Sequence, residues 1–185
     1  MILDVAFLDD ATRPTVPPID GLTRAQREPG EHLKQVHDHL RGNMQTIRTL
    51  IDRAAEGLAS EADVAAETAS LTMVANLRRF GNLCGQYCQL VNGHHSLEDA
   101  HLFPALAAVS DGYRKVTERL GAEHVVVHEL LGRQIDALDA LAREPNAARF
   151  AEARTVFEAL ERVLLSHLGY EEDQIGDALG YYDVF

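Results

Sequence analysis

The segment HHSLEDAHLFPAL, residues 94–106, decides the fold because it places metal-ligand types of side chain within a helical repeat of apolar ones. His94 and Glu98 are four residues apart, so on a helix they lie on the same face, one turn from each other. One such pair arises easily by chance, but several pairs on separate segments indicate a metal site inside a helical bundle. Working outward from this segment, the same spacing recurs twice, in His124 with His128 and in His167 with Glu171.

Each pair lies on a stripe of apolar residues that repeats in steps of three and four, the period of a helix face turned towards a core. A fourth stripe, in residues 33–51, contains His37. His32 and His39 fall among polar residues on the opposite face of that segment, and we expect them at the surface. His95 is expected beside its stripe rather than on it. The predicted metal ligands are therefore His37, His94, Glu98, His124, His128, His167 and Glu171.

Four other side chains are candidates for supporting roles or for alternative ligands. Glu172 directly follows Glu171, and a kinked helix end would turn it inward instead. His101 continues the stripe of the second segment by a further turn. Tyr87 and Tyr170 lie close enough to the predicted ligands to donate a hydrogen bond, to bind metal or to act as redox-active phenols. Simple core packing is the alternative role for both tyrosines.

The ligand types favour a pair of iron ions. A buried carboxylate without a cation costs several kcal/mol, and neither lysine nor arginine falls on the stripes near Glu98 and Glu171. Imidazole and carboxylate without thiolate suit iron or manganese, although zinc also accepts them. Zinc prefers four tetrahedral ligands, so seven donors at one level fit two ions better than one.

The four stripes predict an all-α fold, an antiparallel up-down-up-down four-helix bundle with an extended N-terminal arm. In that topology one histidine of each helix lies within about 10–18 Å of the same end, at roughly 1.5 Å per residue. The ligands would thus share one layer, a result that the periodicity alone did not require. The helices are expected at about residues 30–59, 61–103, 111–143 and 147–175.

The first thirty residues differ from the rest because they hold four of the six prolines, which interrupt helices. An extended arm is expected there, packed along the bundle or across its end, where it would cover the metal site. The expected division of the chain is an N-terminal arm at 1–29, a four-helix bundle at 30–178 and a C-terminal tail at 179–185.

Composition restricts the classes of partner. The 185 residues suit one domain, and 46% of them are hydrophobic. A formal net charge of −12 argues against nucleic acid and against anionic membrane as partners. The chain lacks an apolar run long enough to span a bilayer, and its N-terminal residues are acidic where a signal peptide would be basic. We therefore expect a cytoplasmic protein.

With these residues identified, the chain resembles the hemerythrin-like (HHE cation-binding) family. The resemblance implies a non-haem di-iron centre, bridged by an oxo or hydroxo group and by two carboxylates, with an open position for dioxygen, nitric oxide or peroxide. One departure is that a Glu stands four residues after His167 and another at five, whereas oxygen carriers of the family have an Asp at five. The resemblance rests on VHDHLR at 36–41, HHSLEDAHLFPAL at 94–106, EHVVVHELL at 123–131 and HLGYEEDQI at 167–175.

These features predict a hemerythrin-like protein that binds, senses or detoxifies a small oxidant at its iron pair. Whether it is an enzyme stays open, with catalase-like peroxide decomposition as one activity. An alternative is a di-iron oxidase or oxygenase that acts on an organic substrate, and a second alternative is a metal-free helical interaction module. A reductant protein is a candidate partner, and oligomerisation is left open.

Overall fold

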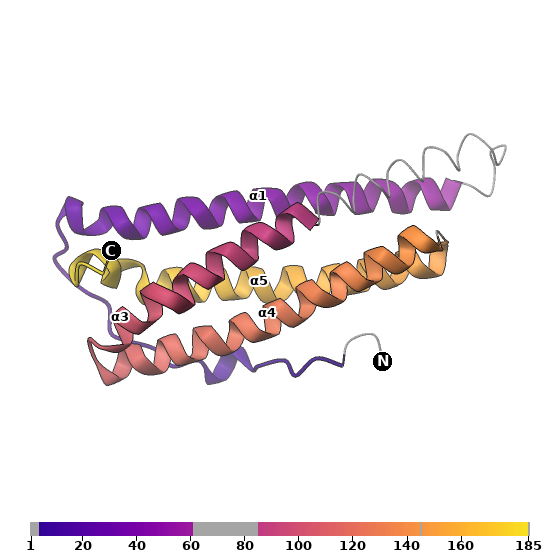
Figure 1. The fold of residues 1–185 in the computed structure, drawn as a ribbon. Helices are drawn as coiled ribbons and strands as arrows, with labels where there is room; N and C mark the ends of the chain where they lie inside the picture. Colours follow the sequence, from indigo (N-terminus) through magenta and orange to yellow (C-terminus); the bar gives the residue numbers. More distant parts are fainter. Residues whose placement is uncertain (1–3, 61–84, 145, 185) are drawn as a thin grey trace.

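The computed structural model describes residues 4–60, 85–144 and 146–184, and every regular element within those ranges is helical. The all-helical prediction is therefore confirmed for this part of the chain, and the arrangement is that of a helical bundle (Figure 1). Residues 85–97 are helical and continue without interruption into η2 and α3. The principal elements are α1 (Arg24–Ser60), the π-helix η2 (Glu98–Leu102), α3 (Phe103–Ala107), α4 (Asp111–Arg143) and α5 (Ala147–Tyr181).

The helices lie roughly side by side along the length of the molecule. In Figure 1, α1 and α4 run from left to right, whereas residues 85–107 and α5 run from right to left. Residues 4–23 pass along α4 towards the end at which α1 begins and contain only the short 3-10 helix η1 (Asp10–Thr12). The C-terminus lies at that same end (Figure 1). Segments distant in sequence are thus brought together there.

Side-chain caps account for the helix starts. The Ser110 hydroxyl accepts a hydrogen bond from the backbone N–H of Tyr113 at 3.3 Å and begins α4. The Asn146 side chain accepts one from the N–H of Arg149 at 2.9 Å and begins α5. Both helices start where the sequence predicts. The predicted helix at 61–103 begins among residues outside those described.

Helix α1 begins at Arg24, earlier than the predicted start near Gly30. Thr23 and Gln26 form a reciprocal cap, in which the Thr23 N–H donates to the Gln26 side chain at 3.0 Å and the Gln26 N–H donates to the Thr23 hydroxyl at 3.3 Å. Pro29 lies inside the helix. A proline removes one helical hydrogen bond, and this cap stabilises the turn before it.

The π-helix η2 changes which residues face the core. The backbone N–H of Phe103 donates to the carbonyl of Glu98, five residues earlier, so this turn holds one residue more than an α turn. The additional residue rotates the following helix. Phe103 and Leu106 become buried, whereas His101 is exposed. The prediction that His101 lies on the inward stripe is therefore wrong.

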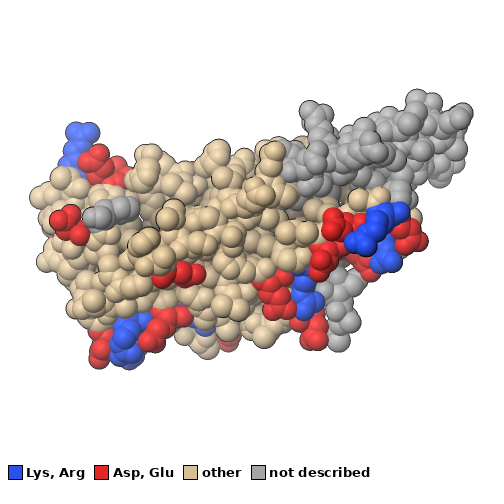
Figure 2. Space-filling model, in the orientation of Figure 1, with Lys and Arg blue, Asp and Glu red and all other residues tan. Residues whose placement is uncertain are grey.

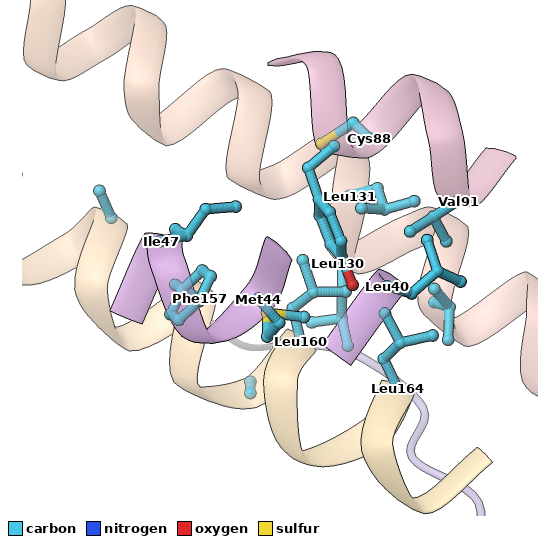
Figure 3. Close-up of a cluster of buried hydrophobic side chains, with 14 of the residues drawn as sticks. Leu40, Met44, Ile47, Cys88, Val91, Leu130, Leu131, Phe157, Leu160 and Leu164 are labelled. Atoms are coloured by element: carbon cyan, nitrogen blue, oxygen red, sulfur yellow. The ribbon is translucent and has the colours of Figure 1, made fainter. Parts of the chain in front are cut away.

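Two apolar clusters fill the interior, with a polar layer between them. On α1, His37 lies between Leu33 of one cluster and Leu40 of the other. On α4, His124 lies between Leu120 and Val127 in the same way. Figure 3 shows the larger cluster, in which side chains from four helical segments meet: Leu40, Met44, Ile47, Cys88, Val91, Leu130, Leu131, Phe157, Leu160 and Leu164.

Helices α1 and α5 approach closely near the end that holds the C-terminus. A Cβ on Gly30 would overlap the backbone of Gly176, and a Cβ on Gly180 would overlap the backbone of Gln26. Only glycine permits this separation. The two glycines therefore fix the distance between the helices that carry His37 and Glu171.

Charged side chains form mixed groups on the surface seen in Figure 2, with uncharged surface between them. Acidic and basic residues are interspersed within these groups rather than gathered into one basic face. None of the helices in the described ranges is long and apolar enough to cross a membrane.

Candidate metal centre

Two groups of metal-ligand side chains lie in the polar layer of the bundle. The first draws on α1, α5 and the helix at 85–102, and the second on α4, α5 and that same helix. Within each group, one ligand atom per residue lies within 4.8 Å of all the others. The first group is His37, His94, Glu98 and Glu171, and the second is His95, His124 and His167.

In three of these histidines, a carboxylate contacts Nδ1, the ring nitrogen that points away from the centre of the layer. Because an ionised carboxylate only accepts hydrogen bonds, the proton of each ring lies on Nδ1 and the lone pair lies on Nε2. Such carboxylates orient metal-binding imidazoles and increase their basicity. The Nδ1 contacts are His37 with Glu172 at 2.9 Å, His124 with Asp99 at 2.8 Å and His167 with Glu123 at 3.1 Å.

The free nitrogens of these rings converge. His37 Nε2 lies 3.0 Å from His94 Nε2, and His124 Nε2 lies 3.1 Å from His167 Nε2. With Nδ1 protonated on both His124 and His167, the inward nitrogens of this pair present lone pairs to each other. Lone pairs at this distance repel unless a cation lies between them.

The two glutamates belong to the first group and also reach histidines of the second. Glu98 is 3.1 Å from His94 Nε2 through one oxygen and 3.6 Å from His124 Nε2 through the other. Glu171 Oε2 is 3.5 Å from His37 Nε2 and 3.6 Å from His167 Nε2. Each carboxylate thus reaches one histidine of each group, as a bridging ligand between two ions would.

Neither of these carboxylates has a hydrogen-bond partner among the described residues. Glu171 is fully buried and Glu98 nearly so. Burial, together with the electrostatic influence of nearby carboxylates, raises the pKa of both groups. Buried carboxylates in this situation need a proton or a cation. A pair of metal ions would supply that charge, so these residues fit such a group.

Three of the surrounding imidazoles, those of His37, His94 and His124, are neutral at neutral pH. Burial, reinforced by neighbouring histidines, lowers the pKa of His37 and His94 to about 3 and that of His124 to about 2. Neutral imidazole is the form that binds metal. Because these three rings carry no proton charge, they do not neutralise Glu98 and Glu171.

The structure brings together six of the seven predicted ligands and adds His95. His128 belongs to neither group. It is partly exposed, and its Nε2 lies 3.2 Å from Nδ1 of His95. His95 is completely buried and stacks on the ring of His124 at a centroid distance of 3.8 Å. The prediction that His95 lies to one side of the buried stripe is therefore wrong.

Helical geometry explains this error. At about 100° per residue, His94 lies about 60° to one side of the fully buried Val91 and His95 about 40° to the other. The two adjacent histidines therefore flank the centre of the buried face. If the inward face of the helix is taken to be one residue wide, only one of the two histidines can lie on it. A helix that packs between two neighbours has a broader inward face, and both histidines turn towards the interior.

The remaining candidates have separate positions. Glu172 accepts a hydrogen bond from Nδ1 of His37 and also forms an ion pair with Arg41 at 2.7 Å. Tyr87 is buried in the larger apolar cluster. The Tyr170 hydroxyl donates to the carbonyl of Pro14 at 2.7 Å, on the side of the N-terminal segment. His32 and His39 are exposed, as predicted.

Sequence reasoning missed two of the three supporting carboxylates. Asp99 directly follows Glu98 in sequence, and Glu123 directly precedes His124. The signal available in the sequence was an acidic residue directly adjacent to a predicted ligand. Glu172, which directly follows Glu171, has the same position. Each of these neighbours acts on a histidine of a different helix rather than on its own.

Comparison with known proteins gave one finding. The model of the family described as the hemerythrin HHE cation binding domain matches residues 31–179 of this chain. Searches of curated proteins and of solved structures returned no significant match. The matched residues include both donor groups and all three supporting carboxylates.

Proposed function

The chain belongs to the hemerythrin HHE cation-binding domain family, and we propose that its two donor groups hold two iron ions with which it binds, senses or detoxifies a small oxidant. The fold proposed with it is the antiparallel four-helix bundle and N-terminal arm that the sequence predicts. Bound iron would supply a place where dioxygen, peroxide or nitric oxide binds and exchanges electrons.

One observation carries the proposal, the placement of Glu98 and Glu171 between the two groups of histidines. Both carboxylates are buried and without hydrogen-bond partners among the described residues. A single divalent ion in the first group would balance the charge of both carboxylates but would leave the three histidines of the second group unused. Two ions bridged by both carboxylates would use every donor of the layer.

The donor set supports iron. Five imidazoles and two carboxylates, without thiolate, suit iron or manganese better than they suit a tetrahedral zinc site. We propose His95 as the fifth histidine ligand, because its ring belongs to the second group and its Nε2 is buried without a hydrogen-bond partner among the described residues. His128 would then hold Nδ1 of His95 in place rather than bind iron itself.

Burial of the donors favours a small oxidant over an organic substrate. His37, His95, His167 and Glu171 have no exposed surface. A cavity of about 310 Å³ beside Arg13 and Glu123 is lined by charged, polar and apolar residues, but by none of the seven donors. Molecules of two to four atoms reach such a centre far more easily than a larger substrate does.

The experiment begins with metal analysis of the gently purified protein. We expect about two iron ions per chain and charge-transfer absorption that bleaches when dithionite is added without air. The reduced protein is then mixed separately with dioxygen, hydrogen peroxide and nitric oxide. A reversible return of the spectrum with dioxygen identifies a carrier, whereas oxygen release from peroxide identifies a detoxifying enzyme.

Two results would contradict the proposal. Less than about one metal ion per chain after gentle purification and iron reconstitution would favour a metal-free interaction module. A colourless protein that binds zinc in preference to iron would contradict the redox function. It would still support the presence of a metal site in this layer.

A further inference from the structure

The N-terminal segment makes several anchored contacts with α4 and α5 near the metal layer. We call residues 9–16 the strap. Asp10 accepts a hydrogen bond from the Ser166 hydroxyl at 2.6 Å, and the Val16 N–H donates to the Gln174 side chain at 2.9 Å. Together with the bond from Tyr170 to Pro14, these contacts hold the strap along its whole length.

Arg13 is the strap residue that reaches furthest towards the site. Its Nε and Nη2 donate to the two oxygens of Glu123 at 2.8 and 2.9 Å, a fork of two parallel charge-assisted bonds. The guanidinium lies over the ring of Tyr170, 4.6 Å from its centroid. Arg119 of α4 donates a third bond to Glu123 at 2.7 Å.

Glu123 connects this arginine fork to the metal layer. It is almost completely buried and accepts a hydrogen bond from His167 Nδ1. Burial raises its pKa, but the hydrogen bonds from His167, Arg13 and Arg119 prevail and hold that pKa at about 2. Two arginines donate three hydrogen bonds to this carboxylate and stabilise its ionised form, so it shares a negative charge among Arg13, Arg119 and His167.

We propose that Arg13 is a positioning residue of the metal centre, which acts through Glu123 to set how strongly His167 donates to its metal ion. This inference rests on the proposed function only in taking His167 as a ligand. In this way a residue of the strap influences the buried centre, although Arg13 and Glu123 are 110 residues apart in sequence.

The direction of the effect follows from charge. In Arg13→Gln, Glu123 keeps its negative charge but loses a cationic partner, so it accepts more strongly from His167 Nδ1. The imidazole then becomes a stronger donor, which favours ferric over ferrous iron and lowers the reduction potential. In Glu123→Gln the acceptor is neutral, so the potential rises.

A first test needs no metal. In the metal-free protein labelled with ¹⁵N-histidine, we expect the Nδ1 proton of His167 to move downfield in Arg13→Gln and upfield in Glu123→Gln. Arg48→Gln is the matched control, because Arg48 makes the same kind of fork with Glu161 on α5 and contacts neither donor group. That variant should leave the His167 signal unchanged.

A second test uses the iron-loaded protein. The reduction potential should fall in Arg13→Gln, rise in Glu123→Gln and stay at the wild-type value in Arg48→Gln. Arg13→Lys keeps the charge without the fork and should give a smaller fall. This variant decides the question if circular dichroism shows that Arg13→Gln does not fold.

The inference is overturned if folded Arg13→Gln, or Arg13→Lys in its place, has the wild-type potential and the wild-type His167 signal. It is also overturned if the arginine variant shifts the potential in the same direction as Glu123→Gln. Failure of the wild-type protein to bind iron would instead sink the proposed function, and the metal-free spectra would still test the link from Arg13 to His167.

Discussion

Each of the three carboxylate-supported histidines has a fixed tautomer, and this makes the role of every ring nitrogen testable. His95 differs from them, because its Nδ1 is held by another imidazole, that of His128, rather than by a carboxylate. The ring of His95 is completely buried and that of His128 is not. The two residues therefore have different roles in the proposed centre, His95 as a ligand and His128 as the residue that holds it.

His95→Ala should lose at least one iron ion per chain, because it removes a donor from the second group. His128→Ala should retain most of the iron and bind it more weakly, by about 10- to 100-fold. Metal analysis of both variants checks this, with the exposed His39→Ala as the control. Normal iron content in His95→Ala combined with loss in His128→Ala would reverse the assignment.

Glu98→Gln should lose both iron ions, because an amide does not compensate two cations shared between the groups. Glu172→Gln should keep both ions but release them faster to a chelator, since it only supports His37. The measurement is iron remaining after a timed challenge with a chelator. Equal release from the two variants would show that Glu98 is not a bridging ligand.

At the scale of residues, position on an apolar stripe predicted six of the seven donors, whereas the four-residue spacing also selected His128, which belongs to neither group. The sequence did not predict His95, because the stripe was taken as one residue wide although the packed face of the helix is broader. It also did not predict Asp99 and Glu123, because each acts on a histidine of another helix. That pairing depends on tertiary contacts, which residue spacing does not encode.

At the scale of helices, the predicted starts of α4 and α5 at residues 111 and 147 are confirmed, and the structure shows that Ser110 and Asn146 cap them. The start of α1 was not predicted, since four early prolines suggested an extended chain and the cap at Thr23 outweighs Pro29. The π turn η2 also escaped prediction. It inserts one residue into an otherwise regular helix. The apolar residues on either side fit a helix with the additional residue as well as one without it.

The contact between α1 and α5 gives a prediction about stability. Gly30→Ala should lower the free energy of unfolding by about 1–3 kcal/mol, because the new Cβ would overlap the backbone of Gly176. Gly132→Ala is the matched control, since Gly132 lies on an exposed face of α4 with open space around it. It should stabilise the protein by up to about 1 kcal/mol.

Chemical denaturation of both variants provides the measurement. Because α1 carries His37 and α5 carries Glu171, Gly30→Ala should also loosen the first donor group and lose iron more readily. Equal stability of the two variants would mean that α1 and α5 do not approach closely in solution.

For the whole molecule, the donor layer separates two apolar clusters, and both pack residues of α1, α4 and α5 against one another. Removal of metal should therefore leave the helical content nearly unchanged but lower the Tm, because metal stabilises the folded chain in proportion to its binding. At a free iron concentration of 100 times the Kd, that stabilisation is about 2.7 kcal/mol. Circular dichroism melting curves with and without a chelator measure both quantities.

A metal-free protein that melts at the same temperature as the iron-loaded one would show that iron does not bind the folded layer. A metal-free protein without helical structure would show instead that the two clusters are insufficient on their own. The expected result lies between these limits, with a folded but less stable chain.

The central claim is that Glu98 and Glu171 bridge two iron ions surrounded by histidine nitrogens. Iron X-ray absorption of the loaded protein tests it most directly, because the spectrum reports both the ligand atoms and the neighbouring metal. The account predicts a nitrogen and oxygen shell together with a clear iron-to-iron contribution. A spectrum with a single iron and no metal neighbour, or with sulfur ligands, would contradict it.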